Sequence, residues 1–133
     1  KSAYDNRTVP MVVFSDPEIA ATGLTEEEAG KAGIKMVIGR APLTASGAAK
    51  VSGSTIGFVK VIANEDGIIL GAHAIGEEAK MLIAEATLAI EMGGTLEDLA
   101  TTIHAHPTMP EALQEAVEDA LGSAIHMYRK RKN

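Results

Sequence analysis

The segment from His104 to Glu111 contains the side chains best suited to chemistry in this sequence. His106 precedes Glu111 by five positions, and Pro107 and Pro110 stiffen the backbone between them. Imidazole titrates near neutral pH, and a neighbouring carboxylate can fix its tautomer and stabilise its protonated form. The spacing therefore indicates a histidine–glutamate pair that could accept and return a proton.

Glu111 also has a structural interpretation. If Thr108 is the N-cap of a helix, Glu111 occupies the third helical position, and the two residues form a capping box worth about 1 kcal/mol. The two roles are compatible, since a carboxylate in the first turn of a helix can reach back to a loop histidine. His106 alone would more often be structural, but Pro107 restricts its backbone to extended conformations, which favours a positioned side chain.

The remaining candidate groups are isolated. His104 could join His106 as a metal ligand, but no third ligand is evident, so no metal site is predicted. Hydrogen-bonded core positions are expected for His73, which interrupts an apolar strand, and for His126. The sequence contains no cysteine, no nucleophile elbow and no glycine-rich dinucleotide loop. The histidine–glutamate pair therefore has no partner chemistry within this chain.

Length and composition are those of one globular domain. The chain has 133 residues, of which 46% are hydrophobic and only 3% aromatic, so aliphatic side chains and alanine must form the core. The net charge of −6 argues against nonspecific binding to nucleic acid, and no apolar segment is long enough to cross a membrane. We expect a linker over residues 1–8, the folded domain over 9–127 and a solvated basic tail over 128–133. Because no methionine precedes Lys1, we also expect a piece of a longer polypeptide.

Strands are expected in the first half of the domain. β-branched or alternating residues predict strands over 9–14 and 34–41, and a loop is expected over 44–54. Two apolar segments within 56–75 flank Asn64-Glu65-Asp66-Gly67, which is typical of a β-hairpin turn. These segments predict an antiparallel sheet.

The strongest helical pattern spans residues 77–92. Its polar arc is thin, and Met81 and Met92 fall at positions assigned to the core. A helix with so little polar surface is expected to be buried on more than one side. The sheet would cover one side, and a partner subunit could cover another.

Shorter helices are expected on either side of this one. A capping box at Thr25 begins a helix that ends at Gly33, and another helix is expected over 95–101. The last helix is expected to begin after Thr108, and Gly122 could end it early and leave a packed tail. Strands that precede helices indicate an α+β domain with helices packed on an antiparallel sheet.

Six segments carry a family resemblance, which covers about residues 9–127. They are Phe14-Ser15-Asp16-Pro17-Glu18-Ile19-Ala20, Gly23-Leu24-Thr25-Glu26, Gly57-Phe58-Val59-Lys60-Val61, Ile69-Leu70-Gly71-Ala72-His73, His104-Ala105-His106-Pro107-Thr108-Met109-Pro110-Glu111-Ala112 and Ala124-Ile125-His126. In this order they resemble the C-terminal interface domain of the dihydrolipoamide dehydrogenase family, which are flavin-dependent pyridine nucleotide–disulfide oxidoreductases.

The resemblance implies a dimerisation domain at the C-terminus of a longer homodimeric flavoenzyme. FAD, NAD and the redox-active cysteine pair would belong to domains that precede it. His106 would be the proton acceptor and donor for a dihydrolipoyl thiol, would act across the dimer interface, and would be oriented by Glu111. The backbone near His106 and Pro107 would lie beside the flavin of the partner subunit.

The resemblance also implies partners and a location. The partners would be lipoyl domains of 2-oxoacid dehydrogenase or glycine cleavage complexes, with no nucleic acid and no membrane involved. The location would be the cytoplasm, or the mitochondrial matrix in a eukaryote. The fragment alone is expected to be inactive and to bind no cofactor. The alternative is a purely structural dimerisation module of a related flavin disulfide reductase with another substrate.

Overall fold

The fold is built on one five-stranded antiparallel sheet. The computed structural model describes residues 3–127, and the strands lie in the order β1-β2-β5-β4-β3. They are β1 (Met11–Val13), β2 (Ile19–Gly23), β3 (Met36–Pro42), β4 (Phe58–Asn64) and β5 (Ile69–Ile75). β3, β4 and β5 form a meander, whereas β2 pairs with the free edge of β5. The predicted antiparallel α+β architecture is confirmed.

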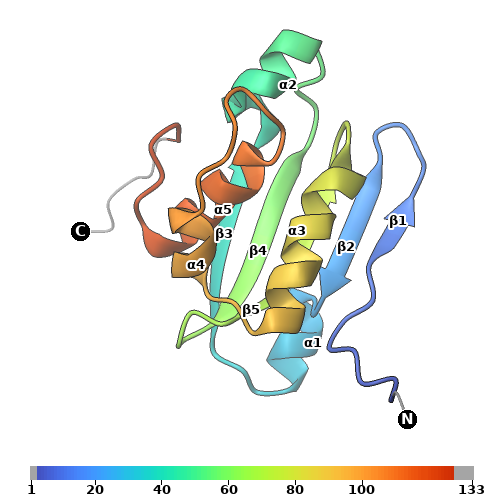
Figure 1. Ribbon diagram of the computed structural model, residues 1–133, viewed down its shortest axis with the longest axis vertical. Coiled ribbons are helices and arrows are strands. Elements are labelled where there is room, and N and C mark those ends of the chain that lie inside the picture. Colours follow the sequence, from blue (N-terminus) through green and yellow to red (C-terminus); the bar gives the residue numbers. More distant parts are fainter. Residues whose placement is uncertain (1–2, 128–133) are drawn as a thin grey trace.

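Two long helices cover one face of the sheet (Figure 1). α3 (Ala79–Met92) packs on β2 and β5, and α5 (Glu111–Leu121) packs on β3 and β4. The short helical segments are α1 (Glu26–Lys31), the 3-10 turn η1 (Leu43–Ala45), α2 (Gly47–Ser52) and α4 (Leu96–Thr101). The connection from α4 to α5 runs back to the end of the sheet where α2 lies (Figure 1).

The core between the sheet and the long helices is aliphatic, as the composition predicts. Its largest fully buried apolar side chains are Leu43, Ile62, Ile69, Leu82, Ile83, Leu113, Val59, Val61 and Val117. Phe14 and Phe58 lie outside it and are 78% and 37% exposed. α5 approaches β3 so closely at Gly39 that a Cβ there would lie 1.9 Å from the carbonyl oxygen of Ala116. A side chain at Gly39 is therefore incompatible with this packing.

Local sequence signals set several element boundaries. The predicted capping box at Thr25 is present, and Thr95 caps α4 in the same way. The side chain of Asn64 accepts hydrogen bonds from two backbone N–H groups of the turn, and Gly67 has a φ of +81°, which closes the predicted hairpin. Gly122, with a φ of +79°, ends α5.

The prediction of a loop over residues 44–54 is wrong, because η1 and α2 occupy most of this segment. The side chain of Ser46 accepts a hydrogen bond from the N–H of Ala49 at 3.3 Å, and Gly53 ends α2 in a left-handed conformation. This helix was not predicted because it consists mainly of small residues and has no apolar periodicity. β2 is missed for a similar reason, since it is short and contains mainly small residues, and the first strand is shorter than expected.

The expectation that Met81 and Met92 lie in the core is also wrong. They are 57% and 77% exposed, and together with Leu88, which is 64% exposed, they form an apolar stripe along the outer side of α3. We refer to these three residues as the α3 stripe. A helical wheel groups residues by face but does not show what covers each face. α3 begins at Ala79, two residues later than expected.

At the N-terminal end, the expected linker over residues 1–8 makes contacts with the folded domain. Thr8, at the end of the expected linker, accepts a hydrogen bond from the N–H of Gly23 at 2.6 Å and donates its own N–H to Glu91 at 3.0 Å. The expected basic tail over 128–133 lies outside the described residues. Among the residues that are described, no helix has the length and apolar character needed to cross a membrane.

Candidate functional site

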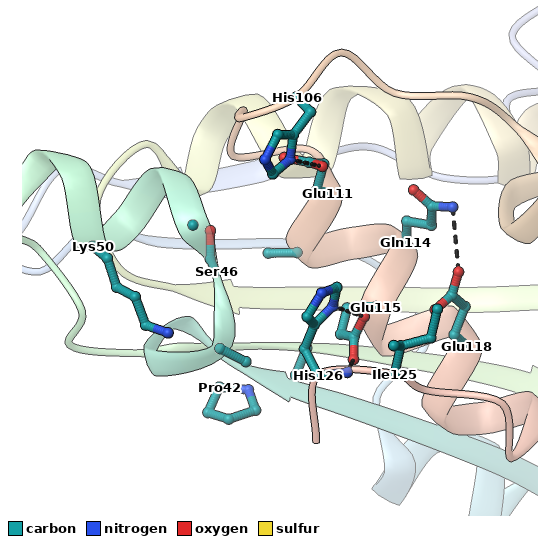
Figure 2. Close-up of a pocket in the computed structure, with 14 residues that line it drawn as sticks. Pro42, Ser46, Lys50, His106, Glu111, Gln114, Glu115, Glu118, Ile125 and His126 are labelled. Atoms are coloured by element: carbon teal, nitrogen blue, oxygen red, sulfur yellow. Dashed lines mark hydrogen bonds and ion pairs between the residues drawn. The ribbon is translucent and has the colours of Figure 1, made fainter. Parts of the chain in front are cut away.

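The loop between α4 and α5 brings His106 and Glu111 together. The Nδ1 atom of His106 lies 2.8 Å from Oε1 of Glu111 (Figure 2). Because an ionised carboxylate can only accept, Nδ1–H donates, and Nε2 is the atom that can take or give a proton. The His106 side chain is 78% exposed, whereas that of Glu111 is 28% exposed. An accessible imidazole is thus oriented by a more buried carboxylate.

The second oxygen of Glu111 is held by the loop itself. Oε2 accepts the N–H of Thr108 at 2.8 Å, while the hydroxyl of Thr108 donates to the carbonyl of Ala105 at 2.6 Å. The N-cap expected at Thr108 is therefore wrong, since its hydroxyl is turned away from the helix and Pro110 is the residue that precedes α5. Only the half of the capping box in which Glu111 accepts a backbone N–H is present.

The surroundings of Glu111 favour its ionised form. Burial is the largest influence on its pKa and acts to raise it. The hydrogen bonds from Thr108 and His106, with the positive charges of His106 and His104, outweigh burial and hold the pKa below its usual value. Glu111 is thus available as an acceptor for the imidazole at neutral pH.

His106 and Glu111 lie at one end of a pocket of about 350 Å³ (Figure 2). Its walls come from the end of β3, from η1 and α2, from α5 and from the chain after α5. A Cβ at Gly47, the first residue of α2, would lie 3.8 Å from Cε1 of His106. The helix that the sequence did not reveal therefore forms the wall beside the imidazole, and Lys50 extends from it toward the pocket (Figure 2).

A second histidine–glutamate pair, which the sequence did not predict, lines the same pocket. Glu115 is 8% exposed and accepts both the backbone N–H of His126, at 2.8 Å, and its Nδ1–H, at 3.1 Å. Burial and the nearby Glu115 raise the pKa of Glu118. The His126 side chain is 68% exposed, so the predicted hydrogen bond is present but the predicted core position is wrong.

The two other histidines occupy contrasting environments. The His104 side chain is 9% exposed, and its ring nitrogens contact Glu85 and Gln114. Both ring nitrogens of His73 are buried without a hydrogen-bond partner, so the hydrogen bond expected there is absent. In residues 3–127, no group of three or more histidine, aspartate or glutamate side chains could hold a metal ion.

The fold and the sequence together define the class of protein. The profile of the family described as "Pyridine nucleotide-disulphide oxidoreductase, dimerisation domain" matches residues 9–117, and the chain belongs to this family. Relatives that match most of this chain are named dihydrolipoyl dehydrogenase. The dihydrolipoyl dehydrogenase of Haloferax volcanii is 54% identical over 125 residues, and that of Geobacillus stearothermophilus is 49% identical over 130 residues.

The matches also define how much of a longer protein this chain represents. The two alignments cover 93% and 97% of this chain but only 26% and 28% of the relatives, so the chain spans about a quarter of their length. A solved structure of RclA, a HOCl-induced flavoprotein disulfide reductase from Escherichia coli, superposes with a TM-score of 0.83 at 28% identity. That superposition covers 89% of this chain and 27% of RclA, and it identifies the sheet and its helices as the fold of flavin disulfide reductases.

Proposed function

We propose that this chain is the C-terminal domain of a flavoenzyme that oxidises dihydrolipoamide with NAD, and that His106 is its acid/base catalyst. The observation that carries the proposal is the oriented, accessible imidazole in a domain of the dihydrolipoyl dehydrogenase type. A thiol with a pKa near 8.5 is mostly protonated at neutral pH, so a base at the site increases the reactive thiolate.

In the proposed reaction, His106 transfers a proton at each stage of the thiol–disulfide exchange. Nε2 of His106 takes the proton of one dihydrolipoyl thiol, and the resulting thiolate attacks the enzyme disulfide to form a mixed disulfide. The cysteine thiolate released in this step receives the proton from His106. The second substrate thiol then gives its proton to His106 and attacks the mixed disulfide, which closes lipoamide and releases the second cysteine as a thiolate. Glu111 keeps Nδ1–H directed away from the thiol and stabilises the imidazolium between transfers.

FAD and NAD supply the electron transfer when bound, and residues of this chain fit a place beside the flavin. His106 and Pro107 are exposed, and within the described residues their carbonyl oxygens accept no hydrogen bond. Either carbonyl can accept an N–H from a flavin ring of the partner subunit. The chain has neither cysteine nor a glycine-rich dinucleotide loop, so the reactive disulfide and the cofactor sites are assigned to preceding domains.

The catalytic assignment is tested with His106→Gln in the full-length flavoenzyme. Glutamine retains polarity but cannot take up a proton, so we expect kcat for dihydrolipoamide to fall by about 10²–10⁴-fold. Flavin content and hydride exchange between NADH and the flavin are expected to be retained. His73→Gln, which changes a histidine outside the site, is the matched control. Retained dihydrolipoamide turnover in His106→Gln would overturn the catalytic assignment and leave a structural pair, whereas a wild-type enzyme without such turnover would support a reductase with another substrate.

The α3 stripe is proposed as part of the homodimer contact. Met81, Leu88 and Met92 are exposed on a helix whose opposite side is in the core, and apolar area of this kind is stabilised by burial against a second copy. We expect Leu88→Glu to weaken dimerisation of the full-length enzyme by about tenfold or more in sedimentation experiments. Ile56→Glu, at a similarly exposed residue outside the stripe, is expected to leave the dimer intact. An unchanged dimer in Leu88→Glu would exclude the stripe from the interface.

The proposed reaction also identifies the carriers of the substrate. Dihydrolipoyl groups are expected on the lipoyl domains of 2-oxoacid dehydrogenase or glycine cleavage complexes. The corresponding location is the cytoplasm, or the mitochondrial matrix in a eukaryote.

A further inference from the structure

The loop that carries His106 is held by side chains rather than by backbone hydrogen bonds. Within the described residues, no N–H or C=O group of residues 103–108 pairs with another backbone group. Met109, which is buried, and Glu111 anchor the C-terminal half of the loop. The N-terminal half needs another anchor, because the exposed ring of His106 adds little packing.

His104 is that anchor. Its Nε2 lies 2.9 and 3.0 Å from the two carboxylate oxygens of Glu85 on α3, and its Nδ1 lies 3.1 Å from Oε1 of Gln114 on α5. The ring is almost buried, at 9% exposure. His104 therefore joins both long helices at a point two residues before His106.

The contacts of Gln114 define which end of its amide faces His104. Nε2 of Gln114 donates to the carbonyl of Ala100 at 3.2 Å and to Oε1 of Glu118 at 3.3 Å, so the amide oxygen faces His104. The reverse amide orientation would direct oxygen at these two acceptors. Nδ1 of His104 therefore faces the amide oxygen of Gln114, and Nε2 faces the carboxylate of Glu85.

We propose that His104, held by Glu85 and Gln114, is a positioning residue for the acid/base reaction of His106. The inference rests on the proposed function. A ring fixed at both nitrogens restricts the translation and rotation of the backbone that follows it. That backbone sets where the imidazole of His106 meets Glu111.

His104 also acts electrostatically on Glu111, the carboxylate partner of His106. It is one of the influences that hold the pKa of Glu111 down, after burial, which opposes them, and after the hydrogen bonds from Thr108 and His106. The ionised carboxylate is the form that accepts from both the imidazole and the loop N–H. His104 thus supports the pair through geometry and through charge.

The test compares Glu85→Gln and His104→Gln in the full-length flavoenzyme, with His106→Gln as the reference. Glu85→Gln keeps the shape of the side chain and removes its charge, which protects the fold. We expect each of the two variants to lower kcat for dihydrolipoamide by about 10- to 100-fold, because a displacement of about 1 Å has effects of this size. KM for dihydrolipoamide and hydride exchange between NADH and the flavin are expected to stay within about twofold of wild type, since the displaced group acts in the proton-transfer step.

Two matched controls separate positioning from general stability. Glu97→Gln changes an exposed glutamate on α4, and His73→Gln changes a histidine without hydrogen-bond partners, so both are expected to keep wild-type kcat. If His104 and Glu85 were only structural, their variants would lower the melting temperature but keep kcat per bound flavin, and the inference would be overturned. If His106→Gln itself kept its turnover, the proposed function would fail first, and this inference with it.

Discussion

Both carboxylate oxygens of Glu111 are occupied, one by Nδ1–H of His106 and the other by the N–H of Thr108. Glutamine has only one acceptor oxygen in its amide, so Glu111→Gln must direct an NH2 group at one of these two donors. We expect kcat of the full-length enzyme for dihydrolipoamide to fall by about 10²-fold or more, as when an orienting carboxylate becomes an amide in other histidine-dependent enzymes. Steady-state kinetics with purified, flavin-loaded variants measure the effect.

Thr108→Val is the control for this prediction. It removes the hydroxyl that donates to Ala105 but keeps the N–H that donates to Glu111, so kcat is expected to change much less. Wild-type kcat in Glu111→Gln would leave Glu111 with only its role at the start of α5.

His73 predicts a pH dependence of stability. Burial first, and then the positive charge of Lys60, hold its pKa below the usual value, partly offset by Glu26 and Glu28. The unfolded chain therefore binds a proton at His73 more readily than the folded domain does. As a result, the free energy of unfolding is not lowered by His73 titration above about pH 6.5, and it falls as the pH drops below that value. We expect His73→Val to raise that free energy by roughly 1 kcal/mol at pH 7 and by more at pH 5, because it also removes two unpaired buried nitrogens. Urea denaturation at both pH values measures this, and parallel pH slopes in wild type and variant would contradict it.

Contacts between residues near in sequence could be predicted, and distant ones could not. His106 and Glu111 are five positions apart in a stiff loop, which is sufficient to predict that they meet. Glu115 and His126 meet only because the chain turns at Gly122, and Glu85 meets His104 only through packing. Such pairs have no characteristic spacing.

At the scale of elements, the packing of α5 on β3 positions Glu111 at the pocket. A Cβ at Gly39 would lie 1.9 Å from the carbonyl oxygen of Ala116 and 2.5 Å from the amide nitrogen of Ala120. Gly39→Ala would therefore force the helix away from the strand, and we expect it to reduce the free energy of unfolding by about 3 kcal/mol. Guanidinium or thermal denaturation measures the change.

Gly30 in α1 is the matched control for Gly39. No atom lies within 4 Å of a Cβ built there, and its φ is not positive, so Gly30→Ala is expected to stabilise the domain by about 0.5–1 kcal/mol. Equal effects of the two substitutions would show that backbone entropy, rather than the contact of α5 with β3, determines the response.

Elements with strong local signals could be predicted, whereas those defined by their neighbours could not. The capping box at Thr25 and the hairpin turn at Asn64 are local devices, and both form. α2 has no apolar periodicity of its own, and β2 exists because β1 and β5 pair with its two edges. The failure to predict α2 has the largest consequence for the site, because α2 forms the wall beside His106.

At the scale of the whole molecule, the proposed function makes this chain one part of a larger site. It has no cysteine and no glycine-rich loop for a dinucleotide. We expect the purified 133-residue chain to show no flavin absorbance and no dihydrolipoamide turnover, whereas the full-length enzyme shows both. Flavin bound to this chain after purification would contradict the assignment of the cofactor site to preceding domains.

The fold class could be predicted from the order of strands and helices, but the surface of the molecule could not. The thin polar arc of the helix over 77–92 indicated a second covered side, yet the wheel assigned Met81 and Met92 to the core. Distinguishing the side buried in the domain from the side left for a partner required the position of the sheet.

The strand order also has a consequence for synthesis and folding. β3, β4 and β5 follow one another along the chain and pair as they appear, whereas β2 pairs with β5 from Ile19 to Ile75, across most of the sheet-forming segment. Closing that long loop is entropically unfavourable, so the meander is expected to form early and the β1–β2 unit to dock on it later. During translation β1 and β2 leave the ribosome before the other strands of this sheet, and the edge of β2 that pairs with β5 remains unpaired until β5 has been made.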